Sequence, residues 1–85
     1  MKKSVWQEQY QTLNSELRAM RKAAGLSQVQ LAQKLDKPQS YVSKYENGDR
    51  YLNFIEVLDV CRACNSSVAL IIEKLGYQAV IKKTV

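Results

Sequence analysis

Four polar side chains gather on one face of a short helix predicted over residues 39–47. They are Gln39, Ser40, Ser43 and Lys44. Val42 and Tyr45 fall on the other face, toward a core. The major groove of DNA admits one α-helix, in which glutamine can hydrogen-bond to adenine, lysine to guanine and serine to either base. Because most polar helix faces are simply solvated, this helix alone leaves both interpretations open.

The residues before this helix predict a second short helix, at 27–35, and a tight turn. Ser27 and Gln30 have the spacing of a capping box, which satisfies free backbone N–H groups at a helix start. An apolar stripe near helical spacing follows, formed by Val29, Leu31, Ala32 and Leu35. Pro38 ends this helix, because the residue before a proline avoids the α conformation, and can itself open the next. The two-helix motif therefore spans 27–48.

Apolar spacing predicts three further helices. A stripe three and four residues apart predicts a first helix over about 4–24, and its members are Trp6, Tyr10, Leu13, Leu17 and Met20. Asn53 and Glu56 form a second capping pattern before a helix at about 54–64, with Ile55, Leu58, Cys61 and Cys64 expected inward. Ser66 or Ser67 caps the last helix, at 68–75.

These elements predict an all-α fold of five helices in a single domain over residues 1–85. Residues 1–16 form an N-terminal extension and residues 76–85 a short tail. The last helix holds more apolar residues than one face can carry, namely Val68, Leu70, Ile71, Ile72 and Leu75. The tail is compatible with a frayed end, a strand that pairs with a partner chain, or a helix extension.

The positive charge is concentrated around the two-helix motif. The chain has a net charge of +5, and residues 18–50 hold seven basic and three acidic side chains. A basic face favours a polyanionic partner, because phosphate contacts release counterions. No apolar run approaches the roughly 18 residues that a membrane span needs. The N-terminus also lacks the apolar segment of a secretory signal, so we expect a cytoplasmic protein.

Cys61 and Cys64 form a C-x-x-C pair that could indicate a zinc or redox site. The chain has no histidine and no other cysteine, so four tetrahedral zinc ligands are hard to assemble. We expect both cysteines to be buried as small hydrophobic residues, with no metal and no cofactor. We also expect that the protein is not an enzyme. Its sequence lacks a glycine-rich phosphate loop and lacks paired carboxylates beside a nucleophile.

Residues 17 to about 75 resemble the five-helix, lambda repressor-like DNA-binding domain of Cro/CI-type (XRE) helix-turn-helix regulators. The resemblance rests on GLSQ at 25–28, LA at 31–32 and QSYVSKYENG at 39–48. Two residues depart from the family pattern. Asp36 replaces the usual turn glycine, and Pro38 replaces a serine or threonine cap.

The resemblance implies roles for individual residues. Gln39, Ser40 and Lys44 match base-reading positions, with Ser43 beside them. The implied phosphate contacts are Gln28 and Asn47, with Arg50 and Lys37 as further candidates. Arg21 and Glu46 match a pair that ties the first helix to the end of helix 39–47.

We therefore expect a sequence-specific regulator of transcription, a repressor that binds double-stranded DNA as a homodimer on a palindromic operator. An activator role is also open. The alternatives are an antitoxin that represses its own operon, with Trp6, Tyr10 or the tail facing the toxin, and a protein-interaction module of the same fold. The expected dimer interface includes Leu70, Ile71 or the tail, opposite Gln39 and Lys44, with the start of the first helix as the alternative.

Overall fold

The computed structural model describes residues 5–77, with side chains from residue 7 onward. These residues form five helices and no strand, which confirms the all-α prediction. The helices are α1 (Val5–Ala23), α2 (Gln28–Leu35), α3 (Gln39–Glu46), α4 (Phe54–Ala63) and α5 (Val68–Lys74). Each end lies within one residue of its predicted position. Ser4 and tail residues 78–85 lie outside the described part of the chain.

Local hydrogen bonds explain where three of the helices begin. At α2, Ser27 Oγ accepts from the N–H of Gln30 at 3.0 Å, and Gln30 Oε1 accepts from the N–H of Ser27 at 2.8 Å. Asn53 and Glu56 make the same reciprocal pair at the start of α4. Ser67 caps α5, which settles the choice between Ser66 and Ser67. Both predicted capping boxes are thus confirmed.

The turn between α2 and α3 depends on a left-handed residue that is not glycine. Asp36 has φ 59° and ψ 45°. The following N–H, that of Lys37, then reaches back to the carbonyl of Ala32 at 2.9 Å and closes the helix end. Pro38 follows in extended conformation and gives α3 no side-chain cap. For a residue with a Cβ atom, the left-handed conformation costs roughly 1–2 kcal/mol.

Asp36→Gly should therefore raise the free energy of unfolding, by about 0.5–1 kcal/mol, because glycine adopts this conformation without a steric penalty. Urea denaturation would measure the change. Gln33→Gly, at an exposed helical position of α2, serves as the control and should lower stability by a similar amount. If both variants lose stability equally, strain at Asp36 is not the explanation.

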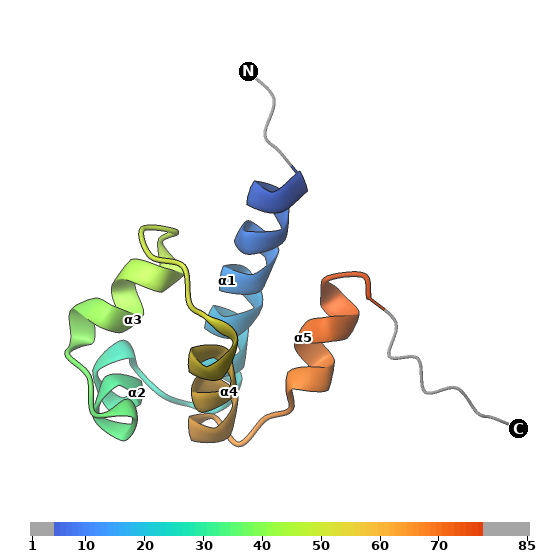
Figure 1. The fold of residues 1–85 in the computed structure, drawn as a ribbon. Helices are drawn as coiled ribbons and strands as arrows, with labels where there is room; N and C mark the ends of the chain where they lie inside the picture. Colours follow the sequence, from blue (N-terminus) through green and yellow to red (C-terminus); the bar gives the residue numbers. More distant parts are fainter. Residues whose placement is uncertain (1–4, 78–85) are drawn as a thin grey trace, which may run out of the picture.

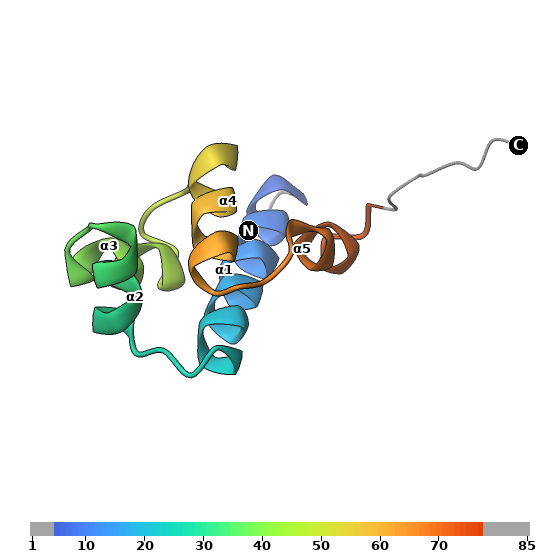
Figure 2. The same cartoon turned by 90° about the horizontal axis from the view of Figure 1, so that it is seen from below.

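The core lies where α1 crosses the other helices. In Figures 1 and 2, α1 runs through the middle of the molecule, with α2 and α3 on one side and α5 on the other. The predicted α1 stripe supplies Leu13, Leu17 and Met20 to this core. The other buried hydrophobic residues are Leu31, Ala32, Val42, Tyr45, Leu52, Val57, Val60, Cys61, Cys64 and Ile71. Burial of the cysteines confirms their assignment as small core residues.

Two residues assigned to inward stripes were placed on the wrong face. Val29 of α2 is 50% exposed and Ile55 of α4 is 62% exposed. Each precedes a buried residue, Leu31 or Val57, by two positions, which is about 200° around an α-helix. They therefore point away from the core. In α4, Cys61 and the following Cys64 face inward as predicted, together with Val57 and Val60, whereas Leu58 is half-buried.

In α5 the excess of apolar residues is divided between core and surface. Ile71 is buried at 3% exposure, whereas its neighbour Leu70 is 52% exposed. Val68, Ile72 and Leu75 are half-buried. No described helix has the length and apolar character needed to cross a membrane.

Candidate nucleic-acid interface

Helix α3 presents its polar face to solvent while its opposite face is fixed in the core. Gln39, Ser40 and Lys44 are exposed, and Ser43 is half-buried. Val42 and Tyr45 are completely buried, so α3 cannot turn about its axis without losing core contacts. The structure therefore places the four predicted base-reading side chains on one rigidly mounted helix.

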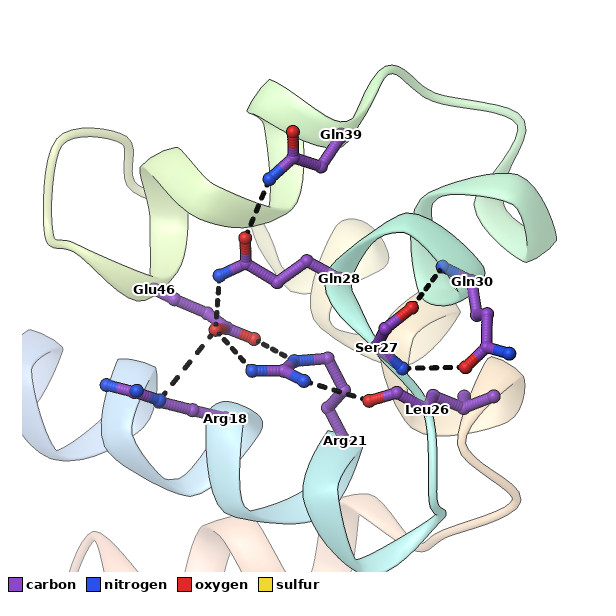
Figure 3. Close-up of polar contacts among 8 residues, drawn as sticks. All are labelled: Arg18, Arg21, Leu26, Ser27, Gln28, Gln30, Gln39 and Glu46. Atoms are coloured by element: carbon purple, nitrogen blue, oxygen red, sulfur yellow. Dashed lines mark hydrogen bonds and ion pairs between the residues drawn. The ribbon is translucent and has the colours of Figure 1, made fainter.

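A glutamine pair joins the first turns of α2 and α3. Gln39 Nε2 donates to Gln28 Oε1 at 2.9 Å. Gln28 Nε2 in turn donates to Glu46 Oε1 at 3.0 Å, as Figure 3 shows. The amide of Gln28 therefore orients Gln39 and is itself oriented by the last residue of α3.

Glu46 is the centre of this network. Arg21 of α1 donates from Nε to Glu46 Oε2 at 2.7 Å and from Nη2 to Oε1 at 3.0 Å, a bidentate pair. Arg21 Nη1 also donates to the carbonyl oxygen of Leu26 at 2.8 Å. Arg18, one turn earlier, has its Nε 4.0 Å from Glu46 Oε1. Helices α1, α2 and α3 thus meet at one carboxylate, and Arg21 also ties in the loop before α2 through Leu26.

The remaining predicted phosphate contacts lie near the two ends of α3. Asn47 directly follows the helix and is exposed. Arg50 donates to Glu56 at 3.0 Å and its guanidinium lies 4.9 Å from the ring centre of Tyr41. The ammonium of Lys37 lies 5.3 Å from the same ring. Arg50 and Lys37 are therefore partly engaged within the protein, as Gln28 is.

Comparison with known proteins agrees with this two-helix geometry. Residues 17–71 match the model of the helix-turn-helix family HTH_3. The chain belongs to this helix-turn-helix family. An XRE-family-like protein from Pseudomonas syringae pv. tomato strain DC3000 is 43% identical, with a TM-score of 0.75 over 80% of this chain and 83% of that chain.

Two structures of the clp gene regulator ClgR from Corynebacterium glutamicum are also similar to this helix-turn-helix chain. Each is 25% identical with a TM-score of 0.72, over 79% of this chain and 86% or 71% of the other. No curated protein sequence matches the chain significantly. The lambda repressor-like fold and the XRE-type resemblance are confirmed.

Electrostatics stabilise the charged form of both partners at the centre of this helix-turn-helix unit. Burial alone would raise the pKa of Glu46, but hydrogen bonds from Arg21 and Gln28 outweigh it and hold the pKa below its ordinary value of 4.5. The hydrogen bond to Glu46 raises the pKa of Arg21. At neutral pH the pair is therefore fully ionised.

The free energy of unfolding should fall as the pH drops below about 4.5. A carboxylate whose pKa is lowered by folding stabilises the protein above its unfolded-state pKa, and this contribution is lost as the group becomes protonated. Glu56, whose pKa is lowered by the Asn53 backbone N–H and by Arg50, acts in the same direction.

Urea denaturation between neutral pH and about pH 3 would measure this loss. Glu46→Gln should give a flatter pH profile than the parent chain, because the contribution of Glu46 is removed while that of Glu56 remains. Parallel profiles for the two proteins would show that ionisation of Glu46 does not contribute.

Sequence reasoning missed three connections at this site. It assigned Gln28 to a phosphate contact but did not predict its hydrogen bonds to Glu46 and Gln39. It gave no role to Arg18, and it did not predict the ion pair between Arg50 and Glu56. Only the Arg50 contact had a local signal, because the capping pattern already places Glu56 near the start of α4.

Proposed function

We propose that this helix-turn-helix protein regulates transcription by reading a specific sequence of double-stranded DNA with α3. The observation that carries the proposal is the exposed face of Gln39, Ser40 and Lys44, on a helix whose other face is fully buried. A helix of this kind fits the major groove, where these side-chain types have matching partners on base edges. Family membership and similarity to a protein named as a gene regulator support the same function.

The first turn of α2 would hold the DNA backbone in register. Backbone N–H groups at a helix N-terminus attract phosphate, and Gln28 stands at that position. The side-chain amide nitrogen of Gln28 carries two hydrogens, and it donates one of them to Glu46. Gln28 can therefore donate to a phosphate while it still orients Gln39. Asn47 and Arg50 would contact the backbone beyond the other end of α3.

We propose repression as the simplest mode of action, because a protein that occupies a promoter operator blocks the polymerase sterically. Selection of bound sequences from a random duplex pool tests the proposal. We expect enrichment of one palindromic sequence and an affinity that falls steeply with salt. Equal, weak binding to every duplex, or none, would instead favour a protein-interaction module built on the same fold.

A homodimer would place two recognition helices on successive turns of one DNA face, about 34 Å apart. Leu70 is the residue of α5 that remains available for such an interface, since Ile71 is committed to the core. Phe54 and Ile55, at the start of α4, are further exposed apolar side chains. Tyr10 instead stacks on Tyr51 within the chain, with ring centres 4.3 Å apart.

Leu70→Asp should convert a dimer to a monomer without unfolding the chain. The substitution places a charge in the proposed apolar interface between subunits but leaves the core unchanged. Sedimentation equilibrium, with circular dichroism as the check on folding, would measure this. Ile71→Asp is the contrasting variant and should unfold the protein. A Leu70→Asp chain that associates as strongly as the parent would exclude α5 from the interface.

A further inference from the structure

A groove separate from the polar face of α3 opens between α2, α4 and the loop that joins α1 to α2. Its volume is about 870 Å³. Leu26, Leu35 and Ala63 line it, and all three are half-buried side chains packed against the core. Apolar surface is therefore left accessible to a partner along this groove. Figure 2 shows the backbone of the elements that carry these residues, α2, α4 and the loop that joins α1 to α2.

Three exposed cations line the same groove, namely Lys34, Lys37 and Arg62. One carboxylate, that of Asp59, lines it as well. Among residues 7–77 the ion pairs are formed by Arg18, Arg21 and Arg50, so no described carboxylate lies within 4.0 Å of these three cations. The groove thus combines an apolar floor with three cations that have no described carboxylate as a partner, although Lys37 also lies over the Tyr41 ring.

The groove lies at the opposite end of α2 from the proposed phosphate contact. Gln28 begins α2, whereas Lys34 and Leu35 end it, about 10 Å further along the helix axis. Arg62 and Ala63 likewise belong to the last turn of α4. Lys37, a predicted phosphate contact, is the one residue of that set that also lines this groove.

We infer that this groove binds an acidic, extended segment of a partner protein that carries an apolar side chain between its carboxylates. Carboxylates would pair with Lys34, Lys37 and Arg62, and the apolar side chain would cover Leu26 and Leu35. A phosphate backbone would match the cations but leave the apolar floor exposed. A small anionic ligand is the poorer fit because such ligands are usually enclosed, whereas these cations face solvent.

The inference can be tested independently of any DNA function. The probe is a fluorescein-labelled peptide in which aspartates and glutamates flank one central leucine, measured by fluorescence anisotropy with the full chain. Lys34→Glu/Arg62→Glu should weaken binding by about tenfold or more, because two attractions become repulsions. Replacing the central leucine of the peptide by asparagine should also weaken binding.

Lys22→Glu/Lys74→Glu is the matched control. It changes the net charge equally and also places two glutamates in the last turns of helices, α1 and α5, but neither residue lines the groove. Thermal melts of both variants establish that each is folded. We expect the control to bind the peptide nearly as well as the parent chain does.

Three outcomes would overturn the inference. Equal loss in the groove and control variants would mean a response to net charge alone. An unchanged affinity for the asparagine peptide would remove the apolar anchor. Displacement of the peptide by a duplex, with the duplex bound more weakly by the groove variant than by the control variant, would assign the groove to nucleic acid.

Discussion

Arg21→Ala should lower the free energy of unfolding by about 3–5 kcal/mol, because it leaves a buried carboxylate without its main partner. The Glu46 side chain is only 2% exposed and that of Arg21 is 9% exposed. Arg21 supplies two of the hydrogen bonds to this carboxylate, at 2.7 and 3.0 Å. Gln28 supplies one more, and Arg18 lies at 4.0 Å, too far to replace the bidentate contact.

Glu46→Ala should cost a similar amount, and the double variant should cost much less than the sum of the two. Removing both partners leaves no unpaired charge, so the coupling measures the contact itself. Thermal and urea denaturation of the four proteins gives the cycle. A coupling of zero would refute an energetic role for the pair.

The exposed ion pair between Arg50 and Glu56 provides the internal control. Its N–O distance of 3.0 Å is close to that of the buried pair, but both side chains are partly in water. Arg50→Ala should therefore cost only about 0–1 kcal/mol. A loss for Arg50→Ala as large as that for Arg21→Ala would mean that burial does not explain the difference.

Lys44→Ala should weaken binding to the selected operator by about 1–3 kcal/mol and leave binding to a scrambled duplex much less affected. Lys44 is exposed, one turn after Gln39 and Ser40 on the same helix. A side chain that reads a base edge contributes mainly to the correct sequence, whereas a phosphate contact contributes to every sequence. Mobility shifts on the two duplexes, at one fixed salt concentration, separate these roles.

Two further variants make the Lys44 result specific. Lys74→Ala removes an exposed cation from α5 and should change both affinities little. Gln28→Ala should weaken binding to both duplexes through the lost phosphate contact, and to the operator somewhat more, because Gln39 also loses its partner. Its melting temperature must be measured because the change also removes a bond to Glu46. Equal losses on both duplexes for Lys44→Ala would contradict base reading by this residue.

The sequence by itself determined the helices of this protein and the face that α3 exposes. Ser27 with Gln30, and Asn53 with Glu56, bond over three residues, so the chain fixes these helix starts without help from the fold. Pro38 located the end of α2, whereas the left-handed conformation of Asp36 was indicated only by the family resemblance, because glycine is usual at that position. The Arg21–Glu46 contact was accessible only through family resemblance, since 25 residues separate the partners.

Only the tertiary structure decided which apolar residues form the core and how the polar residues are linked. Apolar residues in neighbouring positions of a helix are equivalent until another helix covers one of them, as with buried Ile71 and exposed Leu70. The bonds from Gln39 through Gln28 to Glu46 depend on how closely α2 and α3 cross. The basic groove likewise exists because the ends of α2 and α4 approach each other. Helix packing sets these distances, and side-chain spacing within one helix carries no information about them.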